Sequence, residues 1–70
     1  MMPLTMADTG EEKTVLRAGG NPEVRKYLES LGFTAGTNVT VISMISGNVI
    51  VNVRESRVAI SREMAAKIMI

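Results

Sequence analysis

The sequence predicts a mainly β fold, a small and strongly bent antiparallel barrel of the SH3-like kind. Three observations support this prediction. A capped helix begins at Asn21-Pro22, a β-branched run over Asn38–Ile45 meets a hairpin signal at Ser46-Gly47-Asn48, and the chain closes on the apolar Ile68–Ile70. The order of these elements predicts one short helix between the first and second strands and a helical turn before the last strand.

Seventy residues predict one domain, residues 1–70, with a thin core. The core is almost entirely aliphatic, because Tyr27 and Phe33 are the only aromatic residues. Small domains commonly add disulfides or a structural metal, but the chain has no Cys and no His. Oligomerisation or docking on a partner is therefore the expected source of further stability.

The first third of the chain predicts a loose turn, a strand and a helix. Met1–Gly10 favours a turn or short helix that folds one or two apolar side chains onto the core. Glu11–Ala18 reads as the first strand, and Gly19-Gly20 breaks it.

The helix that follows has clear signals at both ends. Asn21 is a typical N-cap and Pro22 suits the first helical position. Gly32 followed by Phe33 is typical of a Schellman stop. Between them lies one apolar stripe, made of Val24, Tyr27, Leu28 and Leu31.

The second half predicts three more strands and a helical turn. Asn38–Ile45 is rich in β-branched residues, and Val49, Val51 and Val53 alternate with other residues along the next strand. Glu55-Ser56 predicts a tight turn, and the next strand runs over Arg57–Ile60. Ser61 caps a helical turn over Arg62–Lys67, and Ile68–Ile70 forms the last strand. An OB-type barrel is the alternative, but it normally has its helix later in the chain.

Composition argues against catalysis and against nucleic-acid binding. The chain has no His or Cys, its carboxylates fall on predicted turns and solvated faces, and no Gly-Lys-Ser/Thr follows its glycines. We therefore expect no enzymatic activity and no cofactor. A net charge of +1 with two aromatics gives little for nucleic acid to bind. The acidic residues Asp8, Glu11 and Glu12 are better explained as exposed turn residues than as an iron site.

No targeting signal or membrane span is apparent, so we expect a cytoplasmic protein. A partner surface is predicted along the helix edge and the hairpin loops. A small barrel would leave apolar side chains uncovered at the helix edge, and Arg54, Arg57 and Arg62 would form a small basic patch at the Glu55-Ser56 turn. Its candidate residues are Tyr27, Leu28, Leu31, Phe33, Arg54 and Arg57.

The order of landmarks resembles the FeoA family over residues 4 to 70. The landmarks are Gly19-Gly20, a helix end Leu28-x-x-Leu31-Gly32-Phe33, a turn and strand Gly36-Thr37-x-Val39-x-Val41, the strand Arg57–Ile60, and a tail Ala65-x-x-Ile68-x-Ile70. The chain departs from the family pattern at Ala35, Tyr27, Glu55-Ser56 and Met64, and its hairpin at Met44–Asn48 is short.

The resemblance implies an accessory protein of ferrous iron uptake. Such a protein would bind the cytosolic part of a FeoB-type permease that carries a GTPase portion, and so lie at the membrane through its partner. The alternative is a free-standing regulatory module related to the C-terminal SH3-like domain of metal-dependent repressors. Self-association through an exposed strand edge, giving a homo-oligomer, is compatible with both.

Overall fold

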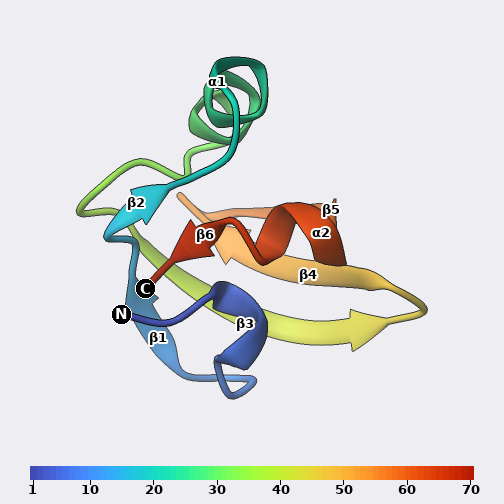
Figure 1. Ribbon diagram of the computed structural model, residues 1–70. Coiled ribbons are helices and arrows are strands. Elements are labelled where there is room, and N and C mark those ends of the chain that lie inside the picture. Colours follow the sequence, from blue (N-terminus) through green and yellow to red (C-terminus); the bar gives the residue numbers. More distant parts are fainter.

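Six strands and three helical segments make up the computed structural model, which describes residues 1–70 (Figure 1). In chain order they are η1 (Leu4–Met6), β1 (Glu12–Thr14), β2 (Arg17–Ala18), α1 (Pro22–Ser30), β3 (Asn38–Ile45), β4 (Asn48–Val53), β5 (Ser56–Ser61), α2 (Arg62–Ala65) and β6 (Ile68–Met69). Helix α1 stands on one side of the molecule, and the long strand β3 runs along the other (Figure 1).

The strands form two antiparallel sheets, of order β1-β3-β4-β5 and β2-β6. The bent, mainly β fold confirms the SH3-like prediction, although the sheets do not join into one continuous barrel. The strand predicted over Glu11–Ala18 is split in two. Between β1 and β2, the Val15 amide donates to the Thr37 carbonyl (2.8 Å), and the Val15 carbonyl accepts from the Gly36 amide (2.8 Å). This loop pairing replaces the sheet ladder at that point.

Helix α1 has the predicted caps at both ends. The Asn21 Oδ1 accepts from the Val24 amide (2.9 Å), and Pro22 is the first helical residue. At the other end Gly32 has φ +110°. The Phe33 amide donates to the Leu28 carbonyl and the Gly32 amide to the Glu29 carbonyl, both at 3.0 Å, which is the Schellman pattern.

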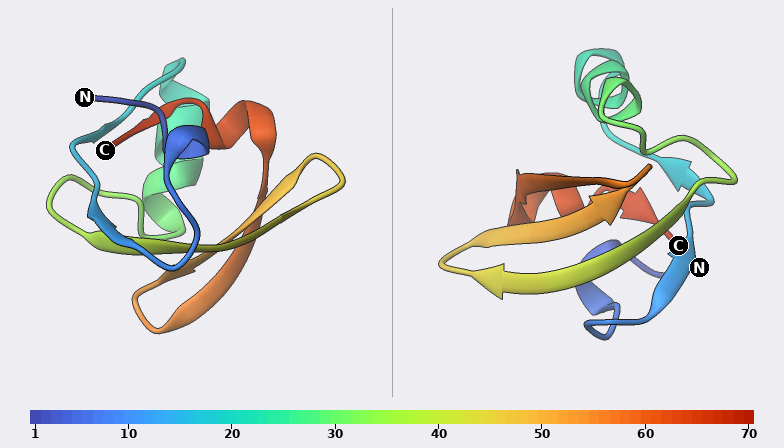
Figure 2. Two further views of the ribbon diagram at one scale, coloured as in Figure 1. Left: turned by 90° about the horizontal axis from the view of Figure 1, so that it is seen from below. Right: turned by 180° about the vertical axis from the view of Figure 1, so that it is seen from behind.

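Two tight hairpins join β3, β4 and β5, and both turns project beyond the rest of the chain (Figure 2). The first turn is Ser46-Gly47, with φ +46° and +83°, and the second is Arg54-Glu55, with φ +49° and +65°. Positive φ at both central residues is the geometry of a type I′ turn. The second turn therefore lies one residue before the predicted Glu55-Ser56.

Strand β3 contains an irregularity between Val41 and Ser43. Val41 pairs with Val51, but Ser43 pairs with Ile50, so Ile42 is an extra residue. The bulge reverses the alternation of the strand. After it, Met44 rather than Ser43 shares the sheet face of the buried Val49.

The core lies inside the bent sheet and is almost wholly aliphatic, as predicted. It holds 14 buried residues: Leu4, Ala7, Val15, Ala18, Leu28, Phe33, Val39, Val41, Val49, Val51, Val53, Ile60, Ala65 and Ile68. The valine face predicted for β4 is confirmed, since all three of its valines are at most 1% exposed. The N-terminal segment contributes Leu4, in η1, and Ala7 to this core.

The C-terminal segment closes the fold. The Ser61 Oγ accepts from the Met64 amide (3.2 Å), which confirms the predicted cap, although α2 ends at Ala65, before Lys67. Strand β6 pairs with β2 and forms a further bridge to Pro3. The last strand was therefore predicted correctly. It joins the N-terminal segment to β2, and the two ends of the chain lie close together (Figure 1).

Candidate interaction surface

Helix α1 divides the neighbouring surface into two parts. Leu28 faces the core and is fully buried. At about 100° per residue, Tyr27 and Leu31 lie on one side of Leu28, and Arg25 and Glu29 lie on the other. One flank of the helix is therefore apolar and aromatic, and the opposite flank is charged.

The apolar flank contains part of the predicted partner surface. Tyr27 is 48% exposed, and Leu31 is half-buried against the core. Leu28 and Phe33 are both 0% exposed, so their assignment to a partner surface is wrong for the folded chain. The Schellman stop explains this, because it commonly packs the residue after the glycine against the last helical turn.

Arg54 lies against the end of the same helix. A Cβ built on Gly32 would lie 3.3 Å from the Arg54 Cδ, so the arginine stem covers this glycine. The Arg54 Nη2 donates to the Thr34 Oγ1 (3.3 Å). A cation at a helix C-terminus is favoured by the helix dipole. We name Tyr27, Leu31 and Arg54 the helix-edge surface.

Arg57 does not belong to this surface. It pairs with Asn52, whereas its neighbour Val58 pairs with the buried Val51. Paired residues of an antiparallel sheet lie on one face and successive residues alternate between faces. Arg57 therefore lies on the face of the sheet opposite the valine core, whereas the Arg54 guanidinium is directed to Thr34 at the end of α1.

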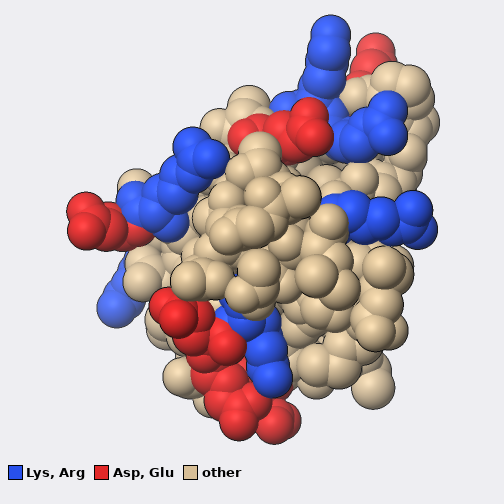
Figure 3. Space-filling view, turned by 90° about the vertical axis from the view of Figure 1, so that its left-hand side faces the viewer, with Lys and Arg blue, Asp and Glu red and all other residues tan.

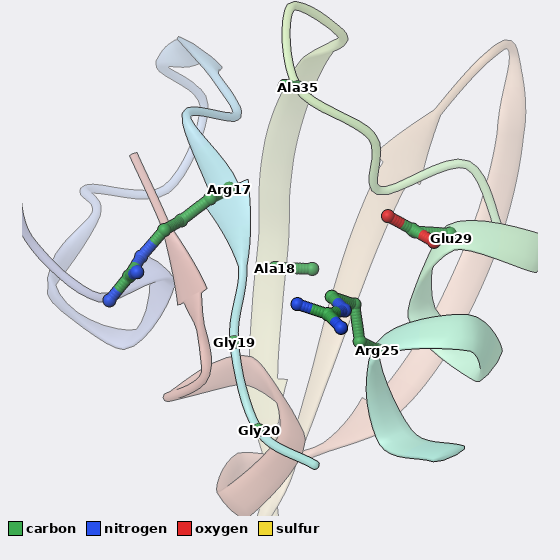
Figure 4. Close-up of a pocket in the computed structure, with 7 residues that line it drawn as sticks. All are labelled: Arg17, Ala18, Gly19, Gly20, Arg25, Glu29 and Ala35. Carbon is green, nitrogen blue, oxygen red and sulfur yellow. The ribbon is translucent and has the colours of Figure 1, made fainter. Parts of the chain in front are cut away.

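On the charged flank a pocket of about 430 Å³ lies between α1 and β2. Its lining residues are Arg17, Ala18, Gly19, Gly20, Arg25, Glu29 and Ala35. Figure 4 shows the Arg25 side chain pointing from the helix toward β2, with Glu29 one turn further along. The Arg17 side chain points away from them (Figure 4). We name this cavity the α1–β2 pocket.

The sequence did not reveal this pocket. Arg25 and Glu29 read as ordinary solvated residues, since nothing in their spacing showed that β2 would lie opposite. One feature of the sequence does point to it, because Gly19-Gly20 directly precedes a capped helix. Two glycines at this place allow a sharp turn, after which the helix lies beside the strand that precedes it. A Cβ on either glycine would lie 3.1 Å from an atom of Lys67, so these glycines permit close packing of the C-terminal segment.

Other exposed apolar side chains were not predicted as a group. Ile42, Met44 and Ile45 are 36%, 36% and 59% exposed and follow one another near the first hairpin turn. The remainder are Met1 and Met6 in the N-terminal segment and Leu16 between β1 and β2. The bulge at Ile42 contributes, because it reverses the alternation and turns Ile45 away from the sheet face that Val41 shares with Val51.

Charged residues of both signs are mixed on the surface. Figure 3 shows Lys and Arg beside Asp and Glu around the margin of one face, with uncharged residues across its middle. Lys13 and Glu11 form an ion pair of 3.4 Å. No three His, Cys, Asp or Glu side chains are grouped so that they could hold a metal ion together. No helix is long and apolar enough to cross a bilayer.

The molecule is thus a small SH3-like domain with an exposed helix edge and one charged pocket. A comparison with protein families matches the FeoA domain over residues 2–70. The chain belongs to the FeoA family, which confirms the resemblance found in the sequence.

Known relatives agree with this assignment. A Methanocaldococcus jannaschii protein, named as a candidate Fe(2+) transport protein A, is 36% identical over 70 residues, which is all of this chain and 85% of that one. The crystal structure of an iron uptake regulatory protein, FeoA, has 29% identity and a TM-score of 0.87, covering 97% of this chain and 90% of that one.

A third comparison concerns the fold alone. The zinc complex of Stenotrophomonas maltophilia FeoA has 20% identity and a TM-score of 0.85, covering 99% of this chain and 88% of that one. That protein is described as an SH3 domain protein and as a suggested ferrous iron transport activating factor.

Proposed function

We propose that this protein is an accessory subunit of ferrous iron transport that acts by binding and not by catalysis. Its partner would be the cytosolic part of a FeoB-type permease. The protein docks on this part from the cytoplasm and stabilises one conformation of the permease. The observation that carries the proposal is the FeoA family match over residues 2–70. The relative named for Fe(2+) transport supports the same assignment at 36% identity.

The helix-edge surface is the part of the molecule that we expect to contact the partner. Tyr27 is the only exposed aromatic side chain, and aromatic anchors with a polar tip are common centres of protein interfaces. Leu31 adds apolar area one turn along the same flank, and Arg54 adds a positive charge at its end. Arg57 would contribute only if the partner also reached the opposite sheet face.

The test is calorimetric binding of the purified protein to the cytosolic part of the permease, measured without nucleotide, with GDP and with a GTP analogue. Tyr27→Ala should weaken binding roughly tenfold, because truncating an interface anchor typically costs about 1 to 2 kcal/mol. Leu16→Ala is a matched control, since Leu16 is also 48% exposed but lies outside the helix-edge surface.

Both variants should keep the wild-type circular dichroism spectrum and melting temperature, because neither side chain is buried. The absence of binding in every nucleotide state would contradict the proposed function. Equal losses of affinity for Tyr27→Ala and Leu16→Ala would leave the partner in place but reject the helix-edge surface as its site.

A further inference from the structure

The α1–β2 pocket contains a cation that has no partner in the folded chain. The ion pair in the structure joins Lys13 and Glu11, and none of the side-chain hydrogen bonds involves Arg25. Arg25 points toward β2, across the opening of the pocket (Figure 4). Arg25 is exposed to solvent, so its guanidinium can be reached by a group that enters the pocket.

Glu29 lies one turn away on the same helix flank but does not neutralise Arg25. Residues four apart on a helix are neighbours, yet the two side chains form no ion pair here. The order of the pair contributes, because an acidic residue placed N-terminal to a basic one gives the better helix pair, and here the order is reversed. The guanidinium therefore keeps its donors available for an external group.

The charge of the pocket selects among anions. Its charged lining residues are Arg17, Arg25 and Glu29, and the Arg17 side chain points away from the other two (Figure 4). One available guanidinium matches a single negative charge. A phosphate, with nearly two charges at neutral pH, would meet the Glu29 carboxylate with only one cation to offset it. A carboxylate also matches the planar fork of arginine.

The size of the pocket also fits a side chain inserted from another protein. A volume of about 430 Å³ lies within the range of small-ligand sites, and it exceeds the volume of one Asp or Glu side chain. Ala18 and Ala35 are the hydrophobic residues of its lining and both are small, so the pocket offers little apolar surface to a large hydrophobic ligand. The Gly19-Gly20 backbone lines one side without side chains that would block entry.

We propose that the α1–β2 pocket binds a carboxylate through Arg25, and that this carboxylate is an Asp or Glu side chain of the partner protein. This inference rests on the proposed function for the identity of the partner, but not for the chemistry of the pocket. It places a second contact on α1, on the flank opposite Tyr27. A partner would then hold the helix from both sides.

The chemistry is tested on the isolated protein by two-dimensional amide NMR, with sodium acetate as the probe and sodium chloride at equal ionic strength as the reference. Acetate should shift the amides of Gly19, Gly20 and Arg25 selectively. Arg25→Gln should abolish these shifts and Lys26→Gln should retain them. Lys26 is the matched control, since it is an adjacent exposed cation of the same helix that does not line the pocket.

Inorganic phosphate serves as the second probe. Stronger or equal shifts with phosphate would overturn the assignment to a carboxylate, and shifts that survive in Arg25→Gln would overturn the role of Arg25. No selective shift with either anion, up to a concentration of about 100 mM, would overturn the site.

The partner is tested with charge variants in the calorimetric assay. Arg25→Glu should lower the affinity for the permease at least tenfold, Lys26→Glu less than threefold, and Glu29→Gln should raise it about twofold. Equal effects of Arg25→Glu and Lys26→Glu would overturn the partner's carboxylate as the ligand. If the wild-type protein does not bind the permease, the proposed function fails, while the acetate titration still decides whether the pocket binds carboxylates.

Discussion

Three residues other than glycine adopt the left-handed region of the backbone, and all lie in the two hairpin turns. They are Ser46, Arg54 and Glu55, with φ of +46°, +49° and +65°. A side chain in this region costs about 1 kcal/mol, which glycine avoids. At Arg54 the strained backbone has a structural role, since the turn brings the arginine side chain to the end of α1. Glu55 forms no ion pair and no side-chain hydrogen bond that would offset this cost.

Replacing Glu55 with glycine should therefore stabilise the protein. We expect Glu55→Gly to raise the free energy of unfolding by about 0.5 to 1 kcal/mol, or the melting temperature by about 4 °C, in thermal denaturation followed by circular dichroism. Ser56→Gly is the control and should destabilise, because Ser56 is in strand β5, where glycine is unfavourable. A lower melting temperature for Glu55→Gly would show that the turn is not strained.

Single residues also mark the limit of what the sequence predicts. The stripe of Val24, Tyr27, Leu28 and Leu31 correctly gave the helix a core-facing side. Periodicity identifies only the centre of such a stripe. Whether the residues at its margins are buried depends on which other elements pack against them. Here the core covers Leu28 completely and leaves Tyr27 half uncovered. The burial of Phe33, by contrast, follows from local sequence, since a Schellman stop commonly packs the residue after its glycine against the helix.

At the scale of elements, strand β3 combines strong β propensity with poor cover. Its stretch Val39–Ile45 has no charge and no proline, which are the features of segments that pair with other chains. Strand β1 covers only the part from Asn38 to Thr40 on one side. The part nearest the turn is therefore the most exposed to unwanted pairing, and Ile45 is 59% exposed there.

A positive charge at position 45 should hinder the pairing of β3 with strands of other chains. We expect Ile45→Lys to raise the concentration at which the protein aggregates on heating, measured by light scattering, with a change in unfolding free energy below about 0.5 kcal/mol. Val41→Lys, in the buried part of the same strand, should unfold the protein. The comparison distinguishes the effect of a charge at the exposed position from its effect in the core. Unchanged light scattering for Ile45→Lys would mean that another segment governs aggregation.

Elements bounded by local chemistry were predicted well, and elements bounded by distant contacts were not. The helix start at Asn21, the strand Asn38–Ile45 and the cap at Ser61 each depend on neighbouring residues. The break at Val15 depends instead on hydrogen bonds to Gly36 and Thr37, about twenty residues away. The α1–β2 pocket has the same origin, because it exists only where two separate elements approach.

For the whole molecule, β6 is the segment on which closure of the fold depends. It pairs with β2, bridges to Pro3, and places Ile68 in the core with no exposed surface. Beside it, Met2 and Ile70 exchange backbone hydrogen bonds of 3.0 and 2.8 Å. A domain of this size has only about 3 to 5 kcal/mol of net stability, so one such residue is a large share of it.

Truncating Ile68 should leave most of the protein unfolded at 25 °C. Ile68→Ala removes a fully buried side chain, which typically costs about 2 to 5 kcal/mol. Amide NMR should show collapsed dispersion for this variant. Met69→Ala, at the half-buried neighbouring position, should remain folded. A well-dispersed spectrum with a wild-type melting temperature for Ile68→Ala would contradict the role given to β6.

The extra residue in β3 has a consequence for chain length. Because Ile42 has no counterpart in β4, removing it would leave Val41 opposite Val51 and Ser43 opposite Ile50. The two strands would keep every other partner and simply lose their local kink. A one-residue deletion anywhere within Val49–Val53, by contrast, would turn part of the valine row outward. Ile42 is thus the position in this hairpin at which one residue could be deleted without moving core-facing side chains to the solvent-facing side of the sheet.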